Sequence, residues 1–185
     1  METHEFTLVL EAAAKLTEPL EDALFEAGCD DATLSFRNGI AYLDFDREAK
    51  SMEAAIISAI RQVEQTKLNV TVKRVEPSDL VTSAEIARRL KRSRQSIQQL
   101  ITGNRGKGDF PLPVAGVTTK TMLWSWQEVT GWFLEKNKLD DKAIHEKAMT
   151  LKQINESLEV RKDDAQLNNI HRITKLLNKR KGEFV

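Results

Sequence analysis

Two short amphipathic helices joined by a tight polar turn are expected between Val81 and Ile101, and this pairing constrains the fold most. Thr82 or Ser83 suits the N-cap of the first helix, and Glu85 is placed to complete a capping box. Ser93 suits the N-cap of the second helix. The inward apolar residues are Ile86, Ala87 and Leu90 on the first helix and Ile97, Leu100 and Ile101 on the second. Two such helices form a helix-turn-helix unit, whose second helix can lie in a DNA major groove.

The polar side of the second helix has side chains suited to reading base edges. With the apolar residues turned inward, four side chains are left outward near its start: Arg94, Gln95, Gln98 and Gln99. Arg and Gln make bidentate hydrogen bonds to guanine and adenine edges. The pattern also leaves open a plainer interpretation, in which two amphipathic helices simply present a solvated polar face.

The residues that follow extend this pattern in one ordered block. The matching positions are Leu80, Glu85-Ile86-Ala87, Leu90, Ser93-Arg94, Ile97, Leu100, Phe110-Pro111, Pro113-Val114, Leu123-Trp124, Trp126, Glu128-Val129 and Trp132. With these motifs the segment 80–133 resembles the excisionase and AlpA-like branch of the MerR-type winged helix-turn-helix proteins. The resemblance implies a β wing after the second helix, a third helix, and DNA binding. The family turn usually holds a Gly where this chain has Lys91.

We expect the DNA contacts to come from the turn, the second helix and the basic wing. The helix 94–102 is expected to read the major groove, whereas Arg92, Lys107 and Lys120 position the DNA backbone. The candidate DNA-binding residues are Arg92, Ser93, Arg94, Gln95, Ser96, Gln98, Gln99, Arg105, Lys107 and Lys120.

Charge divides the chain where the motifs do. Residues 1–80 hold 8 Lys and Arg against 16 Asp and Glu, a net charge of −8, and residues 81–185 hold 20 against 12, a net charge of +8. Residues 81–126 contain eight Lys and Arg side chains but only two carboxylates, Glu85 and Asp109. Such a concentration of positive charge is what phosphate binding needs. The acidic N-terminal part is expected to point away from DNA.

The N-terminal part alternates between strand and helix patterns in the order β-α-β-β-α-β. A strand at 6–10 precedes a helix capped by Thr17. Two alternating segments flank Asn38-Gly39, a strong hairpin signal, and a helix from Ser51 leads to a last strand from Val70. This order predicts a ferredoxin-like sandwich over 1–76. Its single tyrosine and negative charge make it a poor platform for single-stranded nucleic acid, so interaction or dimerisation is favoured.

The C-terminal part predicts a helical hairpin, or a helix with a break, over 139–185. Apolar stripes run through 144–158 and 167–177, and Arg161-Lys162-Asp163 lies between them. Such narrow stripes need a partner to bury them: the rest of the chain, a second copy or another protein. The terminal cluster Lys179-Arg180-Lys181 could add DNA contacts or be a solvated end. The whole chain is therefore predicted to be α+β: a ferredoxin-like sandwich (1–76), a winged helix-turn-helix (77–138) and a helical extension (139–185).

The aromatic residues around Trp124, Trp126 and Trp132 are expected to form the core of the middle domain. Catalytic patterns are weak. The histidines His4, His145 and His171 are scattered, and the glycines fit no phosphate-binding loop. A carboxylate cluster after a strand, such as Asp44, Asp46 and Glu48, usually caps the following loop. Cys29 alone can form neither an intramolecular disulfide nor a cysteine zinc site. We expect no enzyme, no cofactor and no metal.

The function expected is a sequence-specific double-stranded DNA-binding transcriptional regulator, a repressor that acts as a homodimer on its own operon. Two alternatives stay open: an antitoxin that binds a toxin through its N-terminal domain or C-terminal helices, and an excisionase-like architectural protein. The sequence has no apolar run long enough for a membrane span and no signal peptide, so we expect a cytoplasmic protein at the nucleoid.

Overall fold

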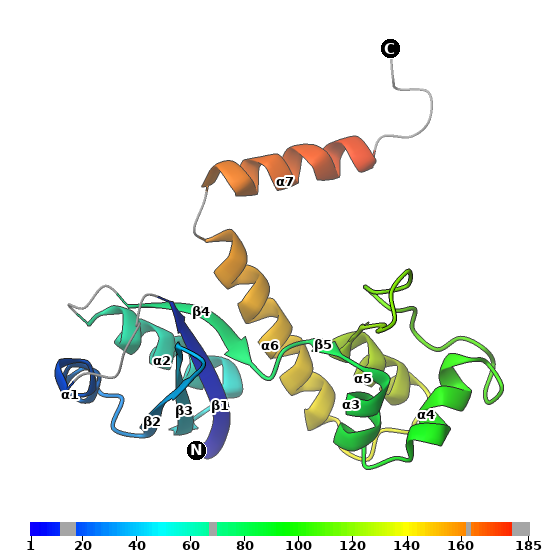
Figure 1. Cartoon of the computed structure of the whole chain (residues 1–185), viewed down its shortest axis with the longest axis horizontal. Coiled ribbons are helices and arrows are strands. Elements are labelled where there is room, and N and C mark those ends of the chain that lie inside the picture. The colour runs from blue at the N-terminus through cyan, green and yellow to red at the C-terminus, as the bar shows by residue number, and fades with distance from the viewer. Residues whose placement is uncertain (12–17, 67–69, 162–163, 179–185) are drawn as a thin grey trace.

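The computed structural model describes residues 1–11, 18–66, 70–161 and 164–178, and it has an α+β fold (Figure 1). The N-terminal part contains β1 (Glu2–Glu11), α1 (Glu18–Glu26), β2 (Ala32–Arg37), β3 (Ile40–Ala49), α2 (Met52–Glu64) and β4 (Thr71–Glu76). The expected cap at Thr17 and the basic cluster Lys179–Lys181 lie outside the described residues. Within those ranges, no helix combines the length and the apolar character needed to cross a membrane.

The four N-terminal strands form one antiparallel sheet in the order β2-β3-β1-β4. The turn predicted at Asn38-Gly39 is confirmed: both residues have positive φ angles, 53° and 77°, as a two-residue hairpin between twisted strands requires. Ser51 caps α2 as expected, because its Oγ accepts a hydrogen bond from the Ala54 amide at 3.2 Å. The chain order of strands and helices predicted for this part is therefore observed.

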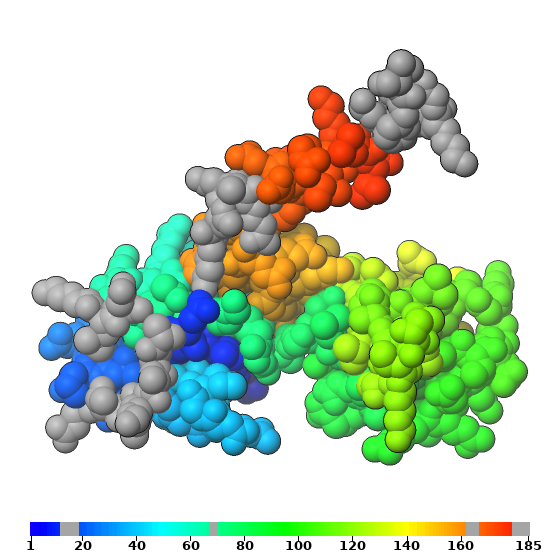
Figure 2. All heavy atoms as spheres, turned by 45° about the horizontal axis from the view of Figure 1, so that its top comes forward, coloured from blue at the N-terminus to red at the C-terminus, as the bar shows by residue number. Residues whose placement is uncertain are grey.

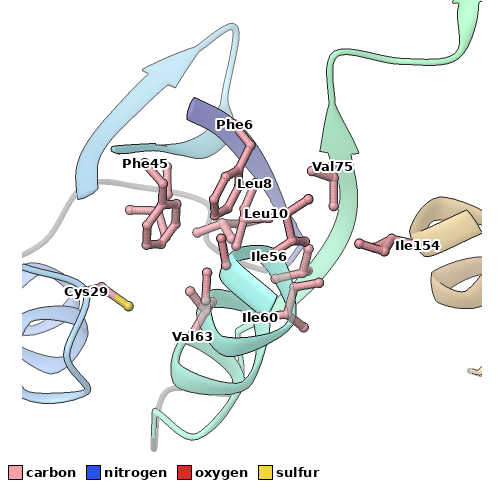
Figure 3. Close-up of a cluster of buried hydrophobic side chains, with 14 of the residues drawn as sticks. Phe6, Leu8, Leu10, Cys29, Phe45, Ile56, Ile60, Val63, Val75 and Ile154 are labelled. Carbon is pink, nitrogen blue, oxygen red and sulfur yellow. The ribbon is translucent and has the colours of Figure 1, made fainter. Parts of the chain in front are cut away.

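The core of this part lies between one face of the sheet and its helices (Figure 3). Alternate residues of β1 and β3 point inward, and the Phe6 and Phe45 rings stack with their centroids 5.1 Å apart. Helix α2 adds Ile56, Ile60 and Val63 from its buried side. The opposite face of the sheet carries the acidic side chains of β3, which leaves the negative charge of residues 1–80 on the surface.

The middle of the chain forms a second cluster around α3 (Ser83–Arg89), α4 (Arg94–Ile101) and α5 (Trp126–Glu135). Two short strands, β5 (Leu80–Val81) and β6 (Trp124–Ser125), pair antiparallel beneath these helices. Its buried residues include Val81, Ile86, Ala87, Ile97, Leu100, Phe110, Trp124, Trp126, Val129, Trp132 and Phe133. The expectation that the aromatic residues form a core is confirmed.

The linker between the two parts is held in place at Asp79. The Asp79 carbonyl accepts a hydrogen bond from the Trp126 amide at 2.7 Å, and its carboxylate accepts one from the Gln127 amide at 2.8 Å. Lys152 lies 3.9 Å from the same carboxylate. Asp79 thus ties the linker to the start of α5 and, through Lys152, to the helix that follows.

Helix α6 (Ala143–Val160) lies between the two parts and contributes to both cores (Figure 1). Leu151, Ile154 and Leu158 join the N-terminal core, and Ala148 joins the middle one. The apolar stripe predicted on this helix is therefore covered within the chain. Helix α7 (Asp164–Leu177) leads away from α6 rather than folding back along it, so the two helices form a broken extension and not an antiparallel hairpin.

The outer edge of β4 is occupied by side chains. Asn155 of α6 accepts a hydrogen bond from the Val75 amide at 2.7 Å and donates one to the Val75 carbonyl at 2.9 Å. Glu64 accepts from the Val72 amide, and Arg161 donates to the Val72 carbonyl and pairs with Glu64. These contacts satisfy backbone groups that an edge strand otherwise leaves open to another strand.

Candidate nucleic-acid interface

The caps predicted for α3 and α4 are present and define the turn between the two helices. The Thr82 Oγ1 accepts a hydrogen bond from the Glu85 amide at 3.2 Å, and the Ser93 Oγ accepts one from the Ser96 amide at 3.1 Å. Between them the chain reverses at Lys91, with φ of 51°. The Lys91 and Arg92 amides donate to the Arg88 and Ala87 carbonyls, a Schellman motif that ends α3.

Lys91 occupies the left-handed conformation that glycine adopts without steric cost. We predict that Lys91→Gly raises the free energy of unfolding by up to about 1 kcal/mol, whereas the β-branched Lys91→Val lowers it by about 1–2 kcal/mol. Urea denaturation measures both changes. Lys147→Gly, at an exposed site within α6, is the matched control and should lower stability by about 1 kcal/mol. If Lys91→Gly and Lys147→Gly changed the free energy of unfolding in the same direction, backbone strain at Lys91 would be contradicted.

The Glu85 carboxylate pairs with two arginines of its own helix and does not belong to the surface expected to face DNA. Its carboxylate accepts hydrogen bonds from Arg88 at 2.6 Å and from Arg89 at 3.0 Å. These two hydrogen bonds lower the pKa of Glu85 from its ordinary 4.5 to about 2. The guanidinium of Arg89 also lies over the Trp126 ring, 5.1 Å from its centroid. Two of the eight cations counted between residues 81 and 126 therefore share one carboxylate, which offsets one of their two charges.

This ion pair predicts a specific pH dependence of stability. Because the folded-state pKa of Glu85 is depressed, its contribution is complete above about pH 4.5 and is lost as the pH falls toward 2. The contribution is small, since Arg88 is 72% exposed and solvent screens the pair. Glu85→Gln should therefore be less stable at pH 7 and show a shallower acid destabilisation between pH 4.5 and 2 in chemical denaturation. Parallel curves for variant and parent would contradict this assignment.

The outward side of α4 is polar, exposed and free of internal contacts. Arg94, Gln95 and Gln98 are exposed, and among the described residues their side chains have no hydrogen bond or ion pair. Gln99 and Ser96 are half-buried at the margin of this side. Ile97 and Leu100 anchor the helix from below. The predicted row of Arg94, Gln95 and Gln98 is thus available to a ligand, while Ser93 is used as the helix cap.

Two of the predicted cations have structural partners. The Arg92 guanidinium lies over the Phe133 ring, 4.8 Å from its centroid, and donates to the Lys138 carbonyl at 2.8 Å. Arg105 donates to the Ser96 Oγ at 3.2 Å, and its amide donates to the Gln99 carbonyl. Arg92 therefore fixes α5 against the turn, and Arg105 folds the loop after α4 back onto that helix.

The loop between α4 and β6, residues 102–123, is attached to the core at two points. The Trp124 indole donates to the Pro111 carbonyl at 3.1 Å, and Asp109 accepts from the Trp132 indole at 3.2 Å and from Lys136 at 2.5 Å. The hydrogen bond from Lys136 is the main cause that lowers the pKa of Asp109. Beyond Pro111, Val114 and Ala115 pair with Leu123 in a short hairpin.

The cations that remain exposed lie in the turn, at the start of α4 and in this loop. Lys91, Arg94, Lys107 and Lys120 are exposed, and across the described ranges none of them has an ion-pair partner. Lys91 was not among the predicted contact residues, although it belongs to the same basic run as Arg92 and follows α3 directly. Lys107 and Lys120 come from the two ends of the loop. The interface available to an anion is therefore smaller than the sequence count suggests.

Comparison of the chain with family models, with curated proteins and with solved structures finds no match. The function must therefore be argued from the residues of the interface themselves.

Proposed function

We propose that this chain is a sequence-specific double-stranded DNA-binding protein, a transcriptional repressor that acts as a dimer on its own operon. In this proposal residues 77–138 form a winged helix-turn-helix domain and residues 1–76 a ferredoxin-like domain. The strand order β2-β3-β1-β4 with two helices on one face supports the second assignment. The Schellman reversal between two capped helices on a common core supports the first.

The observation that carries the proposal is the unoccupied polar side of α4. Arg94 and Gln95 form the first turn of a helix whose start is fixed by the Ser93 cap, and Gln98 follows one turn later on the same side. In a major groove the start of the second helix meets the base edges, and Arg and Gln are the side chains that bind guanine and adenine in bidentate fashion. These three residues therefore read sequence in the proposed complex.

Phosphate contacts in the proposed complex come from Lys91, Lys107 and Lys120, whose charges are exposed on either side of α4 along the chain. Arg92 and Arg105 support the interface indirectly because both are engaged in holding the turn and the loop. The acidic N-terminal domain is repelled by the duplex and is left to interact with protein.

The test is fluorescence anisotropy of the purified chain on the DNA upstream of its own gene and on a random duplex, over a salt series. A preference of about a thousandfold or more for the upstream DNA, with affinity that falls as salt rises, supports an autoregulator. Equal and steeply salt-dependent binding to both duplexes argues for an architectural role. If neither duplex is bound at low salt, the proposal is contradicted.

A further inference from the structure

Helix α7 presents a row of apolar side chains to solvent. Ile170 is 41% exposed, Ile173 is 47% exposed and Leu177 is 79% exposed, and Leu167 starts the same row. Figure 2 shows α7 projecting from the rest of the chain. An apolar row at helical spacing is stable in water only when another surface covers it. The described part of the chain does not cover it.

A groove of matching character lies between α2 and α6. It has a volume of about 450 Å³, and its apolar walls are Ile57, Ile60, Ile154 and Leu158. Figure 3 shows Ile60 and Ile154 approaching from the two helices near Val75. Glu53 lines the groove at the start of α2, and Glu64, paired with Arg161, lines it at the end. The groove is open at Ile57, which is half-buried, whereas Ile60, Ile154 and Leu158 form its deeper lining and are each 9% exposed or less.

The groove and the helix agree in length. From Glu53 to Glu64 α2 rises about 17 Å, at roughly 1.5 Å per residue, and the apolar row of α7 from Leu167 to Leu177 rises about 15 Å. One α7 therefore fills the groove along its length.

Charge selects one orientation. Residues 167–177 of α7 include Arg172 and Lys175 and have no carboxylate. An α7 that runs antiparallel to α6 brings Lys175 toward Glu53, where the groove is acidic. The opposite orientation brings the same cations toward Arg61 and Arg161, whose two charges exceed the single charge of Glu64, and this costs electrostatic energy.

The backbone at the end of α6 indicates whether the α7 that enters the groove belongs to the same copy or to a second copy. Helices α1, α3, α4 and α5 each end near a residue with positive φ: Gly28, Lys91, Gly103 and Asn137. Such residues let a chain reverse directly after a helix. Arg161 instead has φ of −67° and ψ of −17°, in the right-handed helical region, so the chain does not reverse at that residue. Figure 1 shows α7 leading away from α6, which leaves the groove of its own copy open to the α7 of a second copy.

We propose that α7 of one copy docks antiparallel to α6 in the α2–α6 groove of a second copy, and reciprocally, to form a two-fold dimer. Each copy supplies one helix and one groove, so the exchange leaves neither apolar surface open and stops at two chains. The contact uses no residue of the DNA-binding interface, so it stands independently of the proposed function.

Disulfide trapping distinguishes the possible occupants. Full-length chains carrying Ile57→Cys are mixed with chains carrying Ile173→Cys, which lies level with Ile57 in the proposed antiparallel docking, and are oxidised mildly. The native Cys29 is buried, and burial raises its pKa to about 11, so it stays an unreactive thiol. We expect a cross-linked species of twice the 21.0 kDa chain mass in the mixture and little in either variant alone. An intrachain bond in the double variant at monomer mass would overturn the proposal in favour of self-docking. A strong Ile173→Cys homodimer would overturn it in favour of α7 pairing with α7.

Light scattering after size exclusion provides the second measurement. The parent chain should be dimeric, and Ile170→Glu should weaken the dimer by at least about a hundredfold, because a carboxylate would be buried among aliphatic side chains. Asn168→Glu adds the same charge to the opposite face of α7 and should leave the dimer intact. Circular dichroism checks that both variants are folded. A parent chain that is monomeric at tens of micromolar would overturn the proposal.

Discussion

Replacing Trp124 with alanine should lower the free energy of unfolding of the middle part of the chain by about 3–5 kcal/mol. The indole is 2% exposed, sits beside the buried Ile86, Ile97 and Phe133 in one core, and anchors the 102–123 loop through its bond to the Pro111 carbonyl. A loss of this size is a large fraction of the total stability of a small domain. Thermal denaturation followed by circular dichroism measures it.

Two further variants separate packing from the anchoring bond. Trp124→Phe keeps much of the ring but removes the hydrogen bond to Pro111, so it should cost less than the alanine variant. Leu112→Ala in the same loop removes a side chain that is 82% exposed and should change stability by no more than about 0.5 kcal/mol. If Trp124→Ala melts like the parent, the loop does not depend on this core residue.

The second large effect concerns DNA. Arg94→Ala and Gln95→Ala should each weaken binding to the specific site by about 1–3 kcal/mol, because each removes a base contact in the proposed complex. Binding to random DNA should change little for the uncharged Gln95. Lys120→Ala should instead weaken binding to both duplexes similarly and reduce the salt slope by about one unit. Anisotropy titrations at several salt concentrations measure all three.

The control is Gln65→Ala, which removes an exposed glutamine just after α2 and should leave both affinities unchanged. Losses of equal size on specific and random DNA for all three interface variants would contradict the division between base reading and phosphate contact. Arg92→Ala is unsuitable as a phosphate probe, since it also removes the contacts to Phe133 and Lys138.

Local signals in the sequence predicted local structure well. The caps at Ser51, Thr82 and Ser93 and the turn at Asn38-Gly39 depend on residues a few positions apart, and all four are observed. The alternation of apolar residues predicted the order of strands and helices for the same reason. Glu85 departs from its predicted role: its backbone amide donates to the Thr82 Oγ1, but its carboxylate pairs with Arg88 and Arg89.

Contacts between distant parts of the chain were not predictable in this way. The sequence marked the stripe on α6 as needing a partner but could not identify it, because the partner residues lie 80 positions earlier in β4 and 97 positions earlier in α2. The same limit applies to the candidate site. Arg92 and Arg105 look like free cations in a basic run, and only the folded chain brings Lys138 and Ser96 to them.

The side chains that occupy β4 also determine how this chain can aggregate. Growth of a fibre by strand addition requires two open edges on every sheet, so that each added copy offers a new edge to the next. Here Asn155, Glu64 and Arg161 occupy backbone groups along one edge, and β2 at the other end of the sheet pairs on one side only. Edge-to-edge joining of the four-stranded sheet through β2 therefore ends after a single pair of chains.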